Sequence, residues 1–141
     1  MSVLLLDTHV WIWMLEGDAR RIGSRTRRLL DKAHVGGAIR LSPVSVFEVS
    51  ALHTSGRLGL SRSLEQWLEV AIEGAGIRLA PMSRDVAVDA GLLPRALVPD
   101  PVDRLLVATA RHADATFVTA DTKILEYAAA SANLTVQDAA R

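Results

Sequence analysis

The sequence predicts a single α/β domain in which a parallel β-sheet is sandwiched between α-helices. Short apolar runs alternate with helix-like segments along the 141 residues, a pattern typical of parallel sheets. An aspartate directly follows two of these runs: Asp7 follows residues 3–6, and Asp121 follows residues 116–120. Open α/β sheets bind their ligands outside the carboxyl ends of the strands. The two aspartates are therefore expected to meet at one functional edge of the sheet.

The order of elements follows from the spacing of apolar residues. Strands are expected where short apolar runs are bounded by turn residues, at 2–6, 38–41, 77–80, 116–120 and 134–136. Helices are expected where apolar residues recur every three or four positions, at 9–15, 25–34, 43–54, 63–73, 83–93, 101–110 and 121–130. The chain shows no repeat and no linker, so we interpret residues 1–141 as one domain.

Small polar residues mark the starts of the expected helices. Thr8 and Ser24 are the expected caps of the first two helices. Ser42-Pro43 combines a capping side chain with proline at the first helical position. Ser63 and Ser83 start two later helices in the same way.

The composition narrows the class of protein. Half of the residues are hydrophobic and only 4% are aromatic, so the expected core consists of Leu, Val and Ala. No apolar run is long enough to span a membrane, and the absence of cysteine fits a cytoplasmic protein. Zero net charge argues against a basic protein that coats nucleic acid. Fourteen of the 16 basic residues are arginine, and five of these lie in residues 20–28. This cluster is either a solvated face or a patch that contacts phosphate or a partner.

Four acidic residues are the candidate functional side chains. Asp7 and Asp121 follow strands, whereas Glu48 and Asp103 lie in apolar stretches of expected helices. Each has a structural alternative, because an aspartate can cap the next helix and Glu48 can form a buried salt bridge with an arginine. Asp100 stands at a cap position, so Asp103 is the preferred site residue of that pair.

Four carboxylates at one sheet edge would repel one another. Two like charges 4 Å apart cost roughly 4 kcal/mol at an effective dielectric constant of 20. A divalent cation relieves this repulsion, and oxygen ligands without His or Cys favour Mg²⁺ or Mn²⁺ over Zn²⁺. Such a site activates water and stabilises charge on a phosphoryl oxygen, so phosphodiester hydrolysis is the expected reaction class.

Other side chains near Asp7 are weaker candidates. His9 is close enough in sequence to touch a substrate. Trp11 and Trp13 are two positions apart on one helix, so one is expected to pack inside and the other to be exposed. These apolar side chains suggest a groove for a partner or a dimer contact. Arg104 either orients Asp103 or forms an ordinary ion pair.

Four short motifs carry a resemblance that covers nearly the whole chain. They are Leu5-Leu6-Asp7-Thr8-His9, Ser42-Pro43-Val44-Ser45-Val46-Phe47-Glu48, Asp100-Pro101-Val102-Asp103 and Val118-Thr119-Ala120-Asp121. Their order and spacing resemble those of PIN-domain ribonucleases, and specifically VapC-type toxins of bacterial toxin–antitoxin systems. Phe47 and Val102 stand where many members carry Trp and Phe, at positions that look structural.

The resemblance implies a function. It places the family's metal-binding acids on Asp7, Glu48, Asp103 and Asp121. It implies a Mg²⁺- or Mn²⁺-dependent endoribonuclease that stops translation, with an RNA substrate, a cognate VapB-type antitoxin as partner, and a homodimer.

The sequence patterns of two other classes of function are incomplete in this chain. An aspartyl-phosphate phosphatase would need a second acid two residues after Asp7, where His9 stands. A phospho-receiver domain would need an acidic pair after the first strand and a phosphoacceptor aspartate after the third, where Pro81 and Met82 follow. A catalytically inactive binding domain is a further alternative, but all four acids are present. These observations count against the alternatives.

Overall fold

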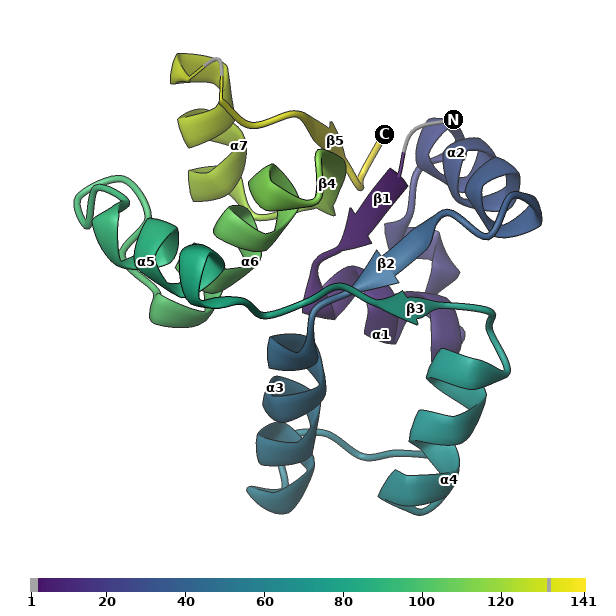
Figure 1. Cartoon of the computed structure of the whole chain (residues 1–141). Coiled ribbons are helices and arrows are strands. Elements are labelled where there is room, and N and C mark those ends of the chain that lie inside the picture. The colour runs from purple at the N-terminus through teal and green to yellow at the C-terminus, as the bar shows by residue number, and fades with distance from the viewer. Residues whose placement is uncertain (1–2, 132) are drawn as a thin grey trace.

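A five-stranded parallel sheet forms the centre of the computed structural model, which describes residues 3–131 and 133–141 (Figure 1). Its strands are β1 (Val3–Leu6), β2 (Ile39–Leu41), β3 (Arg78–Leu79), β4 (Ala115–Thr119) and β5 (Val136–Asp138). They lie in the order β3-β2-β1-β4-β5. The central strand β1 pairs in parallel with β2 on one side and β4 on the other. This arrangement confirms the predicted α/β fold.

The helices cover both faces of the sheet. They are α1 (Thr8–Leu15), α2 (Ser24–Val35), α3 (Pro43–Thr54), α4 (Leu64–Leu68), α5 (Arg84–Leu92), α6 (Pro101–His112) and α7 (Thr122–Ala130), with a 3₁₀ turn over Ala19–Arg21 and a π-helical turn over Glu69–Glu73. Figure 1 shows α5, α6 and α7 on one side of β1, and α1, α2 and α4 on the other. None of the described helices is long and apolar enough to cross a bilayer.

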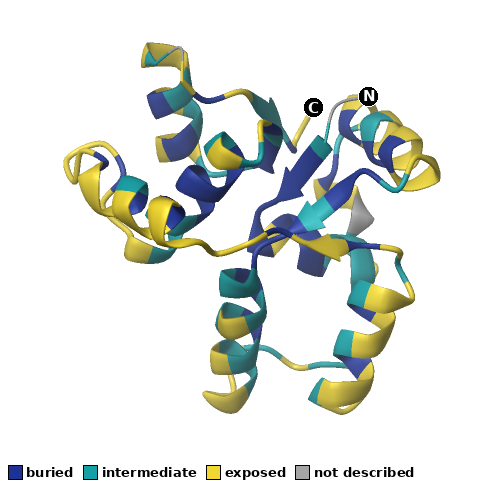
Figure 2. Ribbon diagram, viewed as in Figure 1, coloured by how far each residue is buried: buried dark blue, intermediate teal, exposed yellow. Residues whose placement is uncertain are grey.

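Strand β1 divides the core between the two faces. Successive side chains of a strand point to opposite faces of a sheet. Leu4 and Leu6 accordingly pack with α1, α2 and α4, whereas Leu5 packs with α6 and α7. All three are buried, and Figure 2 shows β1 as a buried strand at the centre of the molecule. The chain can therefore place a polar residue after Leu6 at an edge that the core holds rigidly.

Two expected elements differ from those observed. The last strand lies at Val136–Asp138 instead of 134–136, because backbone pairing with β4 fixes it and its residues Gln137 and Asp138 are polar. The helix expected over 63–73 is α4 followed by the π-helical turn, in which the Gly74 amide bonds to the Glu69 carbonyl at 2.8 Å. The apolar stripe of that segment continues from the α-helix into the π-helical turn, so the spacing of apolar residues did not indicate the change of helix type.

Two helix caps were predicted wrongly. Asp7, not Thr8, is the N-cap of α1, and its carboxylate accepts a hydrogen bond from the Thr8 amide. Gly23, not Ser24, is the N-cap of α2 and makes no side-chain cap bond. The amides of Arg25 and Thr26 instead donate to the Arg141 carbonyl, at 2.9 and 3.4 Å.

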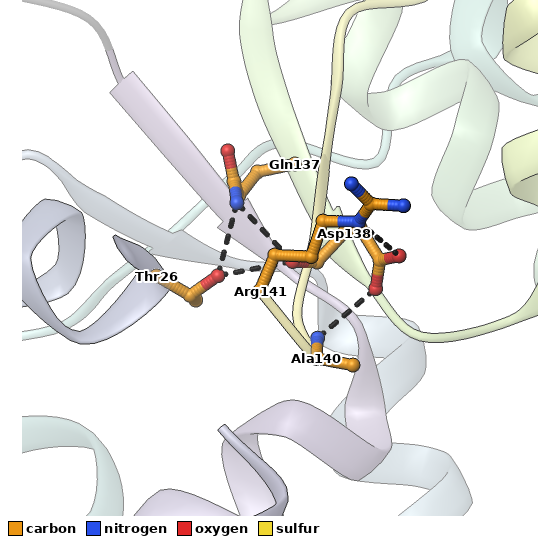
Figure 3. A network of polar contacts seen from close by, with 5 residues as sticks. All are labelled: Thr26, Gln137, Asp138, Ala140 and Arg141. Atoms are coloured by element: carbon orange, nitrogen blue, oxygen red, sulfur yellow. Dashed lines mark hydrogen bonds and ion pairs between the residues drawn. The ribbon is translucent and has the colours of Figure 1, made fainter. Parts of the chain in front are cut away.

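Strand β5 is also joined to α2 by polar contacts, and its last residue contacts the residues that follow it (Figure 3). The Thr26 hydroxyl donates to the Asp138 carbonyl at 3.0 Å, and the Gln137 amide donates to the Thr26 hydroxyl oxygen at 3.1 Å. The Asp138 side chain accepts from the Ala140 amide at 3.0 Å and forms an ion pair with Arg141. A segment from the end of the sequence thus completes the start of α2.

Candidate active site

The four predicted acids line a single pocket of about 320 Å³. It lies at the carboxyl ends of β1 and β4, beside α1, the middle of α3 and the first turn of α6. Its lining consists of the predicted acids and four neighbours, namely Asp7, Glu48, Asp103, Asp121, His9, Trp13, Asp100 and Ala120. The structure therefore brings together carboxylates from four separate segments of the chain, at the sheet edge where the strand pattern placed them.

Asp7 is the buried acid of this pocket, and hydrogen bonds hold both of its carboxylate oxygens. It is only 7% exposed, and its Oδ1 accepts a hydrogen bond of 2.8 Å from the Thr8 amide. Its Oδ2 accepts a hydrogen bond of 2.7 Å from the Thr119 hydroxyl. Burial raises the pKa of Asp7 above its ordinary value, the charge of Glu48 adds to this, and the Thr119 hydrogen bond opposes it.

Asp103 projects from the first turn of α6 and carries the clearest sign of mutual repulsion. Burial is the largest cause of a rise in its pKa to about 7, followed by the negative charges of Asp100, Asp7, Asp121 and Glu48. Asp100 caps the helix, since its Oδ1 accepts from the Val102 amide at 2.8 Å and from the Asp103 amide at 3.3 Å. Asp100 is therefore a cap, as expected, and also a wall of the same pocket.

Glu48 and Asp121 reach the pocket in different ways. Glu48 is half-buried on α3 and, in the part of the chain that the structure describes, forms no salt bridge with an arginine. The buried ion pair that was the alternative for Glu48 is thus not formed. Asp121 caps α7 through hydrogen bonds from the amides of Lys123 and Ile124, so its capping and pocket-lining roles coexist.

The chemistry of these side chains fits a hard divalent cation. Glu48 and Asp103 make no side-chain hydrogen bond or ion pair to another described residue. Burial and, after it, the neighbouring negative charges raise the pKa of Asp103, and a cation would relieve the repulsion among those charges. As the described side chains stand, no three acidic or histidine groups converge tightly enough to hold one ion between them. The donor set, all oxygen, is therefore the feature that fits Mg²⁺ or Mn²⁺.

Two nearby residues, Arg104 and Phe47, differ from the sequence interpretation. Arg104 neither orients nor pairs with Asp103, because its guanidinium donates to the carbonyls of Ala90, Gly91 and Leu93 at the end of α5. Phe47, expected as a structural residue, is 67% exposed. No signal in the sequence distinguishes these outcomes, since both depend on the placing of α5 and α3.

One tryptophan of α1 is buried, as expected, whereas the other is only partly exposed. Trp11 is fully buried, donates from its indole nitrogen to the Ala71 carbonyl at 3.0 Å, and packs edge-on against Trp67. Trp13 is half-buried and lines the acidic pocket beside His9. The pocket therefore has an aromatic wall next to its acidic residues.

Comparisons with known proteins define the class. The family model of the PIN domain matches residues 4–130, and the chain belongs to the PIN-domain family. It is 28% identical over 124 residues to Ribonuclease VapC22 of Mycobacterium tuberculosis, and the aligned region covers 88% of this chain and 91% of that protein. The predicted resemblance to VapC-type PIN domains is thus confirmed.

Solved structures share the fold along almost the whole chain. VapBC2 from Rickettsia felis, bound to a DNA fragment from its promoter, matches with a TM-score of 0.69 at 15% identity, covering 96% of this chain and 97% of that one. FitAcB from Neisseria gonorrhoeae matches with a TM-score of 0.59 at 21% identity, covering 95% and 96%. At these identities the likeness establishes the arrangement of strands and helices.

Proposed function

We propose that this protein is a metal-dependent endoribonuclease and the toxin of a toxin–antitoxin module. The observation that carries the proposal is the pocket in which Asp7, Glu48, Asp103 and Asp121 gather without an ion pair to any described residue. Such an uncompensated cluster is costly for folding, so a functional reason for it is favoured. Membership of the PIN-domain family and the similarity to a protein named as a ribonuclease support RNA as the substrate.

The reaction would add water across an RNA phosphodiester. The water oxygen bonds to phosphorus, the bond between phosphorus and one ribose oxygen breaks, and that oxygen leaves with a proton. A bound Mg²⁺ or Mn²⁺ supplies the positive charge that activates water and stabilises the phosphoryl oxygens. Asp7, Glu48, Asp103 and Asp121 are the residues that would hold it.

The chain's own contacts prepare these ligands. The Thr119 hydroxyl and the Thr8 amide fix both oxygens of Asp7, so its orientation is set before substrate arrives. The Thr119 oxygen also accepts from the Asp121 amide at 3.0 Å, which ties the turn after β4 to the end of β1. Burial and the neighbouring carboxylates raise the pKa of Asp103 to about 7, so a cation held at this carboxyl would compete with a proton near neutral pH.

In the proposed biological context, this toxin is produced together with its antitoxin. We propose that cleavage of RNA inhibits translation in the cytoplasm, and that a VapB-type antitoxin neutralises the enzyme. An acidic pocket favours a basic group from that partner, such as an arginine side chain placed against the carboxylates. The homodimer that the VapC resemblance implies belongs to the same proposal.

Cleavage of single-stranded RNA by purified protein tests the enzymatic part. Cleavage should require Mg²⁺ or Mn²⁺, stop in EDTA and return when the cation is restored. The Asp7→Asn variant, purified identically, controls for contaminating nuclease. Undiminished cleavage in EDTA by wild-type protein, absent from the variant preparation, would refute metal dependence.

Growth on induction tests the toxin part separately. Expression of the wild-type chain should arrest growth, and co-expression of an antitoxin encoded beside it should restore growth. The Asp7→Asn chain, expressed to the same level, should be harmless. Normal growth with soluble wild-type protein would refute the toxin role while leaving the nuclease activity to be decided by the cleavage assay.

A further inference from the structure

A second, larger pocket of about 740 Å³ opens beside the acidic one. It lies between α1, the 3₁₀ turn over Ala19–Arg21 and the loop that follows α3. His9 and Trp13, one helical turn apart on α1, line both pockets. The two pockets therefore adjoin at these two residues, and an extended polymer bound in one can reach the other.

The charges of the two pockets are opposite in character. No Arg or Lys is among the described residues that line the acidic pocket. The larger pocket contains Arg20, Arg21 and Arg57 together with Glu16 and Asp18. Both of these acids are engaged, because Asp18 forms a 2.8 Å ion pair with Arg21 and Glu16 accepts a hydrogen bond from the Ser61 amide.

Two of the arginines are available for a ligand. Arg20 and Arg57 are exposed, and neither forms an ion pair or a side-chain hydrogen bond with another described residue. Two guanidinium groups without partners at the wall of a concave site are suited to phosphate, which they bind through paired hydrogen bonds. The side chains suited to binding phosphate thus line the larger pocket and not the acidic one.

The aromatic wall adds a platform for bases. The His9 and Trp13 rings lie 6.4 Å apart between centroids and are tilted by 48°. The Arg21 guanidinium carbon lies 5.4 Å from the centre of the Trp13 ring, and Asp18 holds that guanidinium in place. Trp13 is thus packed against Arg21, whereas His9 is exposed. An exposed ring at the passage between the pockets is suited to stacking with an unpaired base.

From these contacts we propose that the larger pocket binds the stretch of single-stranded RNA next to the cleaved bond. The first base outside the acidic pocket stacks on His9, and the phosphates beyond it contact Arg20 and Arg57. The proposal rests on the ribonuclease function proposed above and deepens it. It also explains how a polyanion is retained beside the five carboxylates of the acidic pocket, since the attraction acts on phosphates next to the cleaved one.

Kinetics with a single-stranded RNA of about twelve nucleotides, long enough to cross both pockets, test the proposal. The Arg20→Ala/Arg57→Ala variant should raise KM at least about tenfold and leave kcat within about twofold, because it removes phosphate contacts but no reacting group. The slope of log(kcat/KM) against log salt should become shallower by about 1.4, which is about 0.7 for each lost contact. Arg28→Ala/Arg84→Ala, with the same change in charge at exposed residues outside the pocket, should match wild type.

Substitution of His9 distinguishes stacking from proton transfer. His9→Ala should raise KM, and His9→Phe, which keeps a flat ring without a titrating nitrogen, should restore it. Thermal melts of each variant check folding, and the single variants Arg20→Ala and Arg57→Ala provide the same comparison if the double variant is unstable.

The outcomes separate this inference from the proposed function. If wild-type protein cleaves no RNA, the ribonuclease proposal fails and this inference fails with it. If wild-type protein cleaves RNA and the double arginine variant has an unchanged KM and salt slope, only this inference is overturned. The same variant with normal KM but no neutralisation by the antitoxin would assign the pocket to the protein partner and would also overturn it.

Discussion

The Thr119 hydroxyl donates a 2.7 Å hydrogen bond to Asp7 Oδ2 and so joins the ends of β4 and β1 inside the acidic pocket. The same hydroxyl oxygen accepts a hydrogen bond from the Asp121 amide. Thr119 is completely buried, so its hydroxyl has no competing partner in solvent. One side chain therefore positions two of the four proposed metal ligands.

Removing this hydroxyl is expected to affect both stability and activity. Thr119→Val keeps the volume of the side chain but leaves the buried Asp7 Oδ2 without its donor. The free energy of unfolding should fall by about 1–3 kcal/mol, and RNA cleavage should fall because Asp7 loses its fixed orientation. Denaturant unfolding and cleavage rates measure the two effects. Thr119→Ser, which retains the hydroxyl, should keep most of the activity; an equal loss in both variants would contradict the role of the hydrogen bond.

Asp100 and Asp103 offer a matched pair for testing the site assignment. Asp103→Asn should abolish cleavage, because Asp103 is a proposed ligand. Asp100→Asn should retain cleavage, since asparagine caps a helix about as well as aspartate and the hydrogen bonds to the Val102 and Asp103 amides can persist. Cleavage rates and melting temperatures of both variants decide the matter. Inactivation by Asp100→Asn alone would reverse the assignment.

The raised pKa of Asp103, caused first by burial and then by the neighbouring carboxylates, predicts a pH dependence of stability in metal-free protein. Its folded-state pKa, about 7, lies above the ordinary value of 3.8, so the native state binds the proton more tightly than the unfolded chain. This contribution to stability is complete below the unfolded pKa and is lost as pH rises through the folded one. Asp103→Asn lacks the titrating group and should melt at a temperature that increasingly exceeds that of wild type between pH 4 and pH 7.

Melting curves in EDTA at several pH values measure that difference. Above pH 7 it should level off, because Asp103 is then ionised in both states. Saturating Mg²⁺ should reduce or reverse the difference at pH 8, since the cation stabilises only a chain that binds it. A constant difference across this range would show that Asp103 is not the group whose protonation supports the metal-free fold.

The sequence identified the pocket acids because their positions depend on local pattern. Asp7 and Asp121 follow strands, and parallel strands bring their carboxyl ends to one edge. Asp103 and Glu48 interrupt apolar stretches. The opposite charge character of the neighbouring pocket was not predictable in this way, because Arg20 and Arg57 meet only after the 3₁₀ turn and the loop after α3 approach each other. The sequence showed the cluster of five arginines in residues 20–28. It did not show that Arg20 and Arg21 line this pocket whereas the other three lie on α2.

The errors in the fold have a common physical origin. Ser24 has the residue type of a helix cap, yet the cap of α2 comes from the Arg141 carbonyl, and sequence patterning contains no signal for so distant a partner. The strand β5 is half-buried and polar at Gln137 and Asp138, so its apolar pattern is too weak to fix its boundaries. Arg104 was likewise assigned to its sequence neighbour, whereas its partners are carbonyl groups at the end of α5.

The junction between α2 and the end of the chain gives a last prediction. A Cβ atom at Gly23 would collide with the backbone of Arg141, although the Gly23 φ of −70° suits alanine. Gly23→Ala should therefore lower the free energy of unfolding by about 1–3 kcal/mol through overpacking, without a backbone cost. Gly91→Ala is the control, since nothing lies within 4 Å of a Cβ there and alanine favours the helix; it should be neutral or stabilising.

Deletion of Arg141 tests the mechanism in the same system. The deletion alone should destabilise the protein by about 0.5–2 kcal/mol, because the amides of Arg25 and Thr26 lose the carbonyl that caps them. In the shortened chain, however, Gly23→Ala should cost little, because the backbone it would strike is gone. Denaturant unfolding of the four chains forms a double-mutant cycle. Additive losses would mean that Gly23 and Arg141 act independently, and the close contact between them would then not be the reason that α2 begins with glycine.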